Sequence, residues 1–553
     1  MKRSLVRGQT MVLFVLGTLL MVLMATLTVS FAMKVRERIE LQTVTDAAAY
    51  SNAVATARTF NNIAVMNRAQ IGHAVAQAGA TSLVSWATLY RAELNAANTG
   101  FGIGKTPYQI AKNTGCPCAW KNAWCKARCK CGIKGLADLS MLQAKLRAEK
   151  LRVDAVFQSM EFMVRMQMLG HQIAQGALYA AQQDVYRDLR DRLDNQTFAN
   201  RIVGNAMGAG KHVNDASWTV PAIGSVNKKE LSGGTLCSGD GAVCDLPLTV
   251  AHAVNAAMGS RGFTFVTHRQ VASKERHYAI HQANLDFVIW FPDDVVVLPN
   301  TNGTTYFGKK GRQMPWLPPY APAIVADDRG SIGWRYDHLL HGGNPVACPA
   351  SVAGVQSIYS SLVNSGGFPM PEHKWTGGPP GGDPFNHFLV PCLGGVSSCP
   401  GIWPPFLDYN PFRLLNGEGN VYGQPKNFAV VQRDLQARAL DPWDLSFRYR
   451  FEKGGAGNVY DSRSFTLEDG TPNGTQTALS TGIAYYHRGE SAGINHWSEP
   501  PNLLNPYWRA TLVGATIDNT GVDDAVNTLR LSSPVAADTF EELRNAGFKG
   551  LQR

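Results

Sequence analysis

The sequence predicts an α+β protein: an N-terminal transmembrane helix continues into a long antiparallel α-hairpin, and a β-rich, loop-rich C-terminal head with disulfides follows. Three observations support this class. Residues 8–33 carry no charged side chain, residues 35–98 and 136–202 contain no proline, and the remainder is rich in glycine and proline. The expected boundaries are 1–7 for a cytoplasmic tail, 8–33 for the transmembrane helix, 34–203 for the hairpin with a Cys-rich tip at 116–131, and 204–553 for the extracytoplasmic head.

The uncharged segment is long enough to cross a bilayer. Its 26 residues, at about 1.5 Å per helical residue, exceed the roughly 30 Å of a hydrocarbon core. Basic residues flank the segment on both sides, so they do not decide its orientation by themselves. The preceding tail is short, and Glu37 and Glu40 partly neutralise the basic cluster that follows; both points favour a cytoplasmic N-terminus. The alternative is a cleaved signal peptide, because Ser30 and Ala32 are small, although the apolar core is longer than the usual span of roughly 7–15 residues. Both interpretations place the rest of the chain outside the cytoplasm.

Two long helices are expected after this segment. The first spans residues 35–98 and ends at 100–107, where three glycines and a proline interrupt the pattern, and the second spans 136–202. Because neither helix can leave its apolar stripe in water, they are expected to pack antiparallel, with the Cys-rich segment at the turn. The stripe residues are Leu83, Trp86, Tyr90 and Leu94 in the first helix, and Leu139, Leu142, Leu146, Val153, Val156, Met160, Met163, Val185, Leu189 and Leu193 in the second.

The region after residue 204 has the character of short strands and loops. Strands are expected at 287–291, 295–298, 428–431 and 447–451, from apolar runs or from alternation of apolar and charged residues. Between Pro299 and Pro425 the proline density is too high for regular helices, so long loops laid over a sheet are expected there.

Ten cysteines in an extracytoplasmic protein favour disulfides. The pairs Cys237–Cys244 and Cys392–Cys399 have the spacing of small local loops, and five more cysteines lie between Cys116 and Cys131. One of these five needs a partner elsewhere, and Cys348 is the unpaired candidate. The alternative is a four-sulfur zinc site within this cluster, although the paired C-x2-C spacing typical of such sites is absent.

No catalytic, cofactor-binding or metal-binding residue is predicted, and the chain is not expected to be an enzyme. Residues 489–493 match the G-x-S-x-G nucleophile elbow, but no histidine follows His496, so no triad in the required order can be built. Residues 204–211 fail the spacing of a phosphate-binding loop, and His277 and His281 lack a third ligand. The net charge of +10 is scattered without a basic stripe, which argues against a nucleic-acid partner.

Two groups of short motifs resemble a known family. The first comprises residues 7–9, the apolar span, Leu41-Gln42 and 46–50 (DAAAY), with 67–69 (NRA) further along. The second comprises 485–488 (YYHR), 499–502 (EPPN) and 505–510 (NPYWRA). Together they resemble TadG-like proteins of tight-adherence (Tad, or Flp) pilus assembly. The sequence departs from the family in two respects. Position 13 is Leu, where pilin-like relatives often carry Glu, so cleavage after Gly8 is not expected. The string from Asp215 to Thr219 does not form the metal site of a von Willebrand A domain, which some relatives carry.

The resemblance implies a membrane-anchored, non-enzymatic component of a Tad/Flp-type pilus assembly or secretion apparatus, which presents an extracytoplasmic head on a helical stalk. Its expected partners are the lipid bilayer and other subunits of the apparatus. The expected location is the bacterial inner membrane, with a single span and the bulk of the chain periplasmic or extracellular. The alternative is an extracytoplasmic enzyme or carbohydrate-binding protein, in which tryptophans such as Trp334, Trp497 and Trp508 could stack on sugars.

Overall fold

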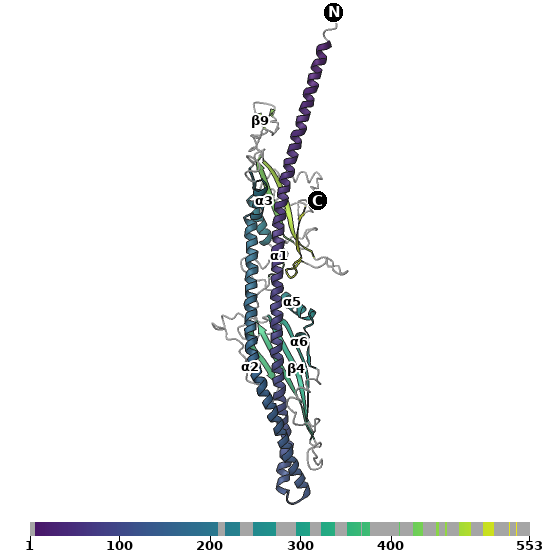
Figure 1. Cartoon of the computed structure of the whole chain (residues 1–553), viewed down its shortest axis with the longest axis vertical. Helices are drawn as coiled ribbons and strands as arrows, with labels where there is room; N and C mark the ends of the chain where they lie inside the picture. Colours follow the sequence, from purple (N-terminus) through teal and green to yellow (C-terminus); the bar gives the residue numbers. More distant parts are fainter. Residues whose placement is uncertain are drawn as a thin grey trace. The chain divides into compact units, whose positions relative to one another are not determined.

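A computed structural model describes two long helices and three antiparallel sheets (Figure 1). The residues that it describes are 6–207, 216–232, 247–271, 295–309, 322–337, 351–365, 368–376, 407, 409, 424–434, 450–452, 459–461, 475–487, 501–513, 530 and 538. The predicted strand at 287–291 and the cysteines at 237, 244, 348, 392 and 399 lie outside them.

The chain divides into two compact units that are not consecutive in sequence. Unit 1 comprises Met1–Asn67, Ala180–Cys244 and Leu407–Arg553, and unit 2 comprises Arg68–Tyr179 and Asp245–Phe406. Both units take segments from each side of the boundary expected at residues 203 and 204. Each therefore combines a stretch of the long helices with a sheet from the later part of the chain.

Helix α1 (Val6–Gly115) is continuous, which confirms that the apolar segment runs on into a long helix. The predicted interruption at residues 100–107 is wrong, because Pro107 lies inside α1. An interior proline costs about 3 kcal/mol, and the burial of Phe101 and Tyr108 on either side offsets this cost. The glycines serve close packing: a Cβ on Gly100 would lie 2.2 Å from Trp334 Nε1, and one on Gly104 would lie 3.1 Å from Trp334 Cζ3.

Helix α2 (Ala123–Asp194) forms the predicted antiparallel partner of α1 in unit 2 (Figure 1). Gln70 and Gln175 each donate a side-chain N–H to the other's backbone carbonyl at 3.2 Å. Further along, Gln143 donates to the carbonyl of Asn98 at 2.8 Å. As the residue number rises on one helix it falls on the other, which establishes the antiparallel direction.

The ends of α2 differ from the prediction of 136–202. Most of the Cys-rich segment is itself helical: a short 3-10 helix, η1 (Cys116–Cys118), ends the first arm, and α2 begins at Ala123. The backbones can approach closely there because both arms carry glycine, and a Cβ on Gly115 would lie 2.7 Å from Cys129 N. At the other end α2 stops at Asp194, Gln196 has a φ of 50°, and helix α3 (Thr197–Met207) follows.

Unit 2 contains a five-stranded antiparallel sheet in the order β2-β3-β4-β5-β6. Its strands are β2 (Arg269–Val271), β3 (Val295–Lys309), β4 (Pro322–Asp337), β5 (Ser351–Ser365) and β6 (Phe368–Thr376). Helices α5 (Pro247–Ser260) and α6 (Thr264–Thr267) precede them. The strand expected at 295–298 is confirmed as the start of β3.

Long loops were the wrong prediction for much of 299–376, because the prolines there occupy positions that a strand tolerates. Pro322 is the first residue of β4, and Pro369 and Pro371 lie in the edge strand β6. Pro299 lies in β3 outside the stretch 301–303 that pairs with β2. A missing N–H at these positions interrupts few ladder hydrogen bonds.

Unit 1 contains a four-stranded antiparallel sheet in the order β1-β7-β10-β11 and a separate pair, β8-β9. The strands are β1 (Ala216–Thr219), β7 (Lys426–Asp434), β8 (Arg450–Glu452), β9 (Val459–Asp461), β10 (Thr475–Tyr486) and β11 (Trp508–Val513). The strand expected at 428–431 is confirmed within β7. Helix α4 (Ala222–Ser232) packs against β7 through Ile223 and Val430.

In each unit the sheet packs on α1 itself. Leu41 and Val44 of α1 join Val431 and Ala478 in a core of unit 1, and Ala74 and Ala78 join Phe307 and Ile324 in a core of unit 2. The predicted stripes are therefore incomplete descriptions of the buried faces. Leu83, Val156 and Met163 are exposed, whereas small polar residues such as Ser82, Ser85 and Thr88 are buried. A sheet packs closely on a helix through small side chains, so apolar spacing alone did not identify this face.

Candidate functional site

The apolar start of α1 is exposed along its whole length. The span Thr10–Val29 has a mean hydropathy of 2.5, and none of it is buried; among the described helices it alone is long and apolar enough to cross a membrane. Its hydroxyls bond within the helix: Thr18 donates to the carbonyl of Phe14 at 3.0 Å, and Thr26 donates to that of Val22 at 2.9 Å. Such internal bonding is what a helix in lipid requires. A signal sequence would have the same length and composition.

The part of α1 that follows docks on the sheet of unit 1 through polar side chains. Gln42 donates to the backbone carbonyl of Leu479 at 3.1 Å and to Asp46 Oδ1 at 2.9 Å. Glu40 pairs with Arg433 at 3.2 Å, and the side chain of Arg433 is completely buried. Arg38 also donates to the backbone carbonyl of Thr477. Together these contacts fix which face of the helix meets β7 and β10.

Alanines in the DAAAY segment bring the helix and the sheet into close contact. Ala48 and Ala49 are completely buried against Ala429 of β7. A Cβ on Gly482 of β10 would lie 2.6 Å from the carbonyl oxygen of Ala49 and 2.9 Å from Ala53 Cβ. Larger residues at these positions would push the sheet away from α1.

The two groups of motifs that carry the resemblance meet in unit 1, although more than 400 residues separate them in sequence. Asn61 donates to the carbonyl of Trp508 and accepts from the N–H of Trp508, both at 2.9 Å. Asn67 donates to the carbonyls of Leu503 and Leu407, both at 2.7 Å. Asn67 of the first group and Trp508 of the second therefore both take part in the contact between α1 and the later part of unit 1.

Trp508 is the centre of an aromatic cluster at this contact. Its ring lies edge-on to Phe60 of α1, with centroids 4.7 Å apart, and to Tyr486 at 5.6 Å. The indole N–H donates to the carbonyl of Asn502 at 2.9 Å, and the amide of Asn502 donates to the Tyr486 hydroxyl at 3.0 Å. Burial raises the pKa of the neighbouring Tyr409, so this phenol stays protonated at physiological pH.

Asparagine side chains hydrogen-bond the backbone of strand residues that lack a neighbouring strand on one side. In unit 1, Asn227 of α4 exchanges two hydrogen bonds with the backbone of Phe428, at 2.8 and 2.7 Å, beyond the stretch of β7 that pairs with β1. In unit 2, Asn255 does the same for Phe307, at 2.7 and 2.8 Å, beyond the stretch of β3 that pairs with β2. Asn61 bonds the backbone of Trp508 in the same way, in the edge strand β11. A side-chain amide can donate an N–H and accept on its oxygen at the same time, which matches the carbonyl and the N–H of a strand residue and blocks its exposed edge.

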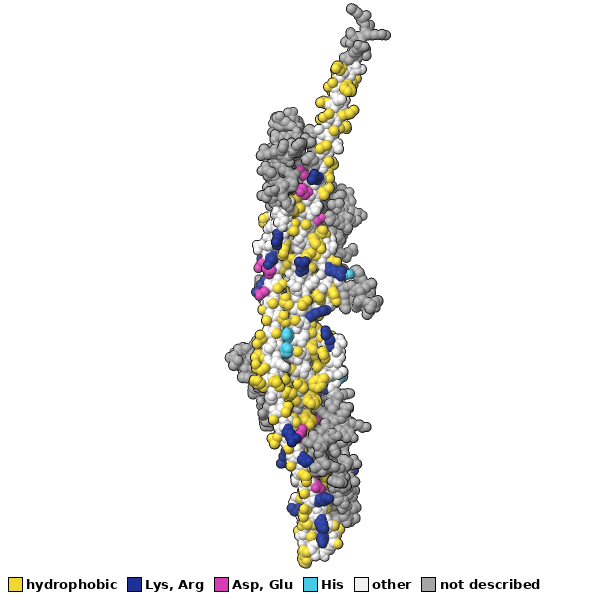
Figure 2. Space-filling model, viewed as in Figure 1, with side chains coloured by type: hydrophobic (Ala, Val, Ile, Leu, Met, Phe, Trp, Pro, Cys, Tyr) yellow, Lys and Arg dark blue, Asp and Glu magenta, His cyan; other side chains and the backbone are white. Residues whose placement is uncertain are grey.

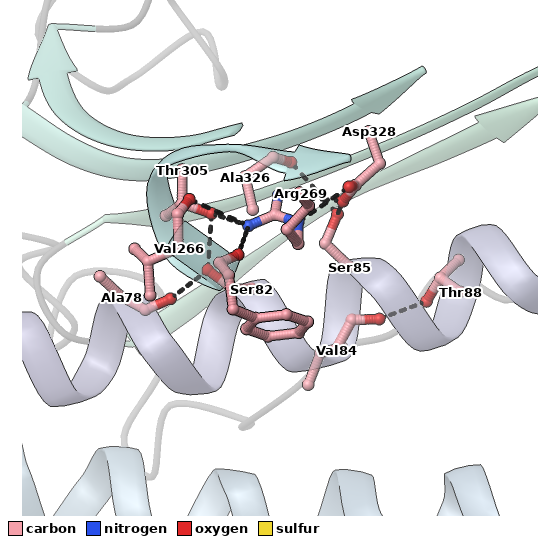
Figure 3. A network of polar contacts seen from close by, with 11 residues as sticks. Ala78, Ser82, Val84, Ser85, Thr88, Val266, Arg269, Thr305, Ala326 and Asp328 are labelled. Carbon is pink, nitrogen blue, oxygen red and sulfur yellow. Dashed lines mark hydrogen bonds and ion pairs between the residues drawn. The ribbon is translucent and has the colours of Figure 1, made fainter. Parts of the chain in front are cut away.

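A buried ion pair holds the sheet of unit 2 on α1 (Figure 3). Arg269 of β2 makes two hydrogen bonds to Asp328 of β4, at 2.9 and 3.1 Å, and a third to the Thr305 hydroxyl at 2.7 Å. From α1, Ser85 donates to Asp328 and the Ser82 hydroxyl bonds to that of Thr305. All five side chains are buried. Since their polar atoms face one another and not solvent, the cluster has the form of a structural network.

Two histidines meet across the hairpin of unit 2. His73 Nδ1 lies 3.0 Å from His171 Nδ1, and the centroids of the two rings are 5.2 Å apart. One ring must donate and the other accept, so at least one ring has an unprotonated Nδ1. Burial, with a smaller effect of His73, lowers the pKa of His171.

The Cys-rich tip contains two disulfides, Cys116–Cys129 and Cys118–Cys125. Cys131 is also disulfide-bonded, and its partner is not among the described residues. Cys348 stays the predicted partner. A four-sulfur zinc site at the tip would require the thiolates that these disulfides use.

The remaining sequence motifs lie outside the described residues or are not assembled by them. The 489–493 motif with His496, the histidines at 277 and 281, and residues 208–215 all fall outside. Among the residues that the structure describes, no three His, Cys, Asp or Glu side chains are grouped to hold a metal ion. The contacts of Asn61, Arg433 and Asp328 were missed by sequence reasoning, because an isolated polar residue carries no spacing signal.

Comparison with protein families finds a similarity at the start of the chain. No curated protein and no solved structure matches the chain. Residues 8–56 match the family Tad, described as "Putative Flp pilus-assembly TadE/G-like". This match confirms the resemblance expected for the N-terminal segment: residues 8–56 are similar to the Flp pilus-assembly TadE/G-like family.

Proposed function

We propose that the protein is a membrane-anchored, non-enzymatic component of a Tad/Flp-type pilus assembly or secretion apparatus. The observation that carries the proposal is the extent of the family match. Residues 8–56 include both the exposed apolar span and the residues from Gln42 to Ala53 that dock on the sheet of unit 1. The matched segment thus joins a lipid-compatible surface to a protein core within one helix.

The proposed mechanism follows from this continuity. The apolar span holds the chain in the bacterial inner membrane as a single-pass anchor, and the bulk of the chain lies in the periplasm or outside the cell. Because α1 runs without a break from the apolar span to the residues that pack on the sheet of unit 1, this sheet is held by the membrane through a helix and not through a flexible linker. The remaining surfaces are available for other subunits of the apparatus.

The polar clusters support a structural function. The amides of Gln42, Asn61 and Asn67 bond backbone carbonyls. The Arg269–Asp328 pair is buried and is hydrogen-bonded by the hydroxyls of Thr305 and Ser85. Groups with these partners hold elements together and do not face a substrate. Two of the tryptophans considered for carbohydrate binding are buried: Trp334 is 6% exposed and Trp508 is 3% exposed, so neither ring can stack on a sugar.

A complementation experiment tests the proposal. In the organism that encodes the chain, deletion of its gene is expected to remove Flp-type pili from the cell surface, measured by immunoblotting of sheared pilin. Re-expression of Leu20→Arg, which places a charge in mid-span at a cost of about 2.5–3.5 kcal/mol, is expected to restore few pili, whereas Leu20→Ile restores them. Normal piliation in the deletion strain would contradict the proposed function.

Topology requires its own measurement. A reporter that is active only outside the cytoplasm is expected to work when it is fused after residue 60. Activity of a cytoplasmic reporter alone at that position would overturn the proposed location.

A further inference from the structure

The end of the hairpin, residues 112–134, has a surface unlike the rest of unit 2; we call this segment the hairpin tip. The sequence contains no acidic residue between Glu93 and Asp138. The same stretch contains seven basic residues: Lys105, Lys112, Lys121, Lys126, Arg128, Lys130 and Lys134. The lysines of the hairpin tip are exposed, and Figure 2 shows Lys and Arg side chains over this part of unit 2.

Two tryptophans at the hairpin tip are exposed as well. Trp120 is 80% exposed and Trp124 is 43% exposed, whereas Trp334 and Trp508 lie in cores. A cation lies over each exposed ring: Lys121 Nζ is 4.9 Å from the centroid of Trp120, and the guanidinium of Arg128 is 4.9 Å from that of Trp124. Apolar rings with cations at their faces combine two surfaces that favour different parts of a lipid headgroup region.

The hairpin tip is also held in shape. Two disulfides cross-link η1 to the first turns of α2, and Asn122 Oδ1 accepts the N–H of Cys125 at 2.7 Å to cap α2. A surface that is already ordered loses little conformational entropy when it binds. The backbone that carries the two tryptophans therefore needs little further ordering when it binds.

We propose that the hairpin tip binds the surface of a bilayer that contains anionic phospholipid. The charge complementarity is direct, because the cations of the hairpin tip can meet lipid phosphates and residues 94–137 contain no acidic side chain. The indoles enter the interface between headgroups and acyl chains, where tryptophan is enriched. A sugar site fits less well, since such a site surrounds aromatic rings with hydrogen-bonding groups, and the amide oxygen of Asn122 is already used.

Vesicle flotation with the full-length protein tests the proposal. The chain is reconstituted in nanodiscs of phosphatidylcholine, which occupy its apolar span, and is mixed with free vesicles. Vesicles of phosphatidylcholine and phosphatidylglycerol in equal amounts are expected to carry the protein upward, and vesicles of phosphatidylcholine alone are not. Molar salt is expected to reduce the binding, because it screens the charges.

Two sets of variants separate the charges from the rings. The triple variant K121Q/K126Q/K130Q is expected to lower partitioning about a hundredfold, since each basic residue near an anionic surface contributes about a fivefold factor. W120A/W124A is expected to lower it at unchanged charge. The matched controls are R187Q/R192Q and F162A, which alter exposed residues of α2 outside the hairpin tip and are expected to bind normally. Disulfide mapping confirms that each variant is folded at the hairpin tip.

Three outcomes would overturn the proposal. They are equal binding to both kinds of vesicle, unchanged binding of W120A/W124A, and retention on an alginate resin without any binding to vesicles. The last result would assign the surface to an acidic polysaccharide. None of these outcomes depends on the proposed function in pilus assembly.

Discussion

In unit 1 the sheet is attached to α1 by amides that bond strand backbones and by an ion pair whose carboxylate, Glu40, is 37% exposed. In unit 2 it is attached by hydroxyls that bond an ion pair buried on both sides, Arg269–Asp328, and by an indole that packs on glycines. When an amide side chain that bonds a strand backbone is removed, a neutral backbone group is left without its hydrogen-bond partner. An ion pair that loses one member leaves a buried charge. Similar architectures can therefore differ greatly in their sensitivity to single substitutions.

The largest expected effect is in unit 2. Asp328→Asn leaves Arg269 buried without its counter-charge and is expected to lower the free energy of unfolding of unit 2 by about 3–5 kcal/mol. The double variant R269M/D328L removes both charges and is expected to recover most of this loss. Hydrogen exchange of β3 and β4 in the full chain provides the measurement. If the double variant is as unstable as the single one, the charge is not the cause.

Close packing in unit 1 is expected to produce a smaller effect. Gly482→Val places a side chain against the carbonyl of Ala49, and overpacking of this kind costs about 1–3 kcal/mol. The matched control is Gly204→Ala in α3, where a Cβ would meet nothing within 4 Å and a gain of about 0.5–1 kcal/mol is expected. Denaturant unfolding monitored by exchange in β10 distinguishes the two. Equal stability of both variants would show that the helix and the sheet are not in close contact.

The asparagine at the strand edge provides the third comparison. Asn61→Ala leaves the N–H and the carbonyl of Trp508 without their partner and is expected to cost about 1–3 kcal/mol. Asn113→Ala, on an exposed face of α1, is the control and is expected to be nearly neutral. Exchange rates of β11 amides report the difference. A neutral Asn61→Ala would show that water replaces the amide without loss.

The smallest expected effect concerns pH. Because the pKa of His171 is lowered in the folded chain, the unfolded chain binds more protons between the folded pKa and about 6.5. The contribution of this group is therefore fully present above about pH 6.5 and is lost as the pH falls through the lowered pKa of the folded state. His171→Gln is expected to make hairpin stability less dependent on pH below about 6.5. An unchanged dependence would exclude the histidine pair as its source.

The sequence predicted what depends on composition and periodicity. The apolar span, its continuation as a helix, the antiparallel hairpin and the strands at 295–298 and 428–431 were all accessible from runs of residues. The continuity of α1 through Pro107 was not, because it depends on how Trp334 fits against Gly100 and Gly104. Contacts such as Asn61 with Trp508 join residues far apart in sequence, and no local pattern reports them.

The central claim is that helix α1, which contains the family-matched segment 8–56, serves unit 1 as the element on which its sheet is built. Hydrogen exchange of the full chain in nanodiscs tests it, with the triple variant Q42A/N61A/N67A compared to the unmodified chain. The account predicts that amides of β10 and β11 lose protection in the variant while those of β3 and β4 are unchanged. Full protection of β10 and β11 in the triple variant would contradict it.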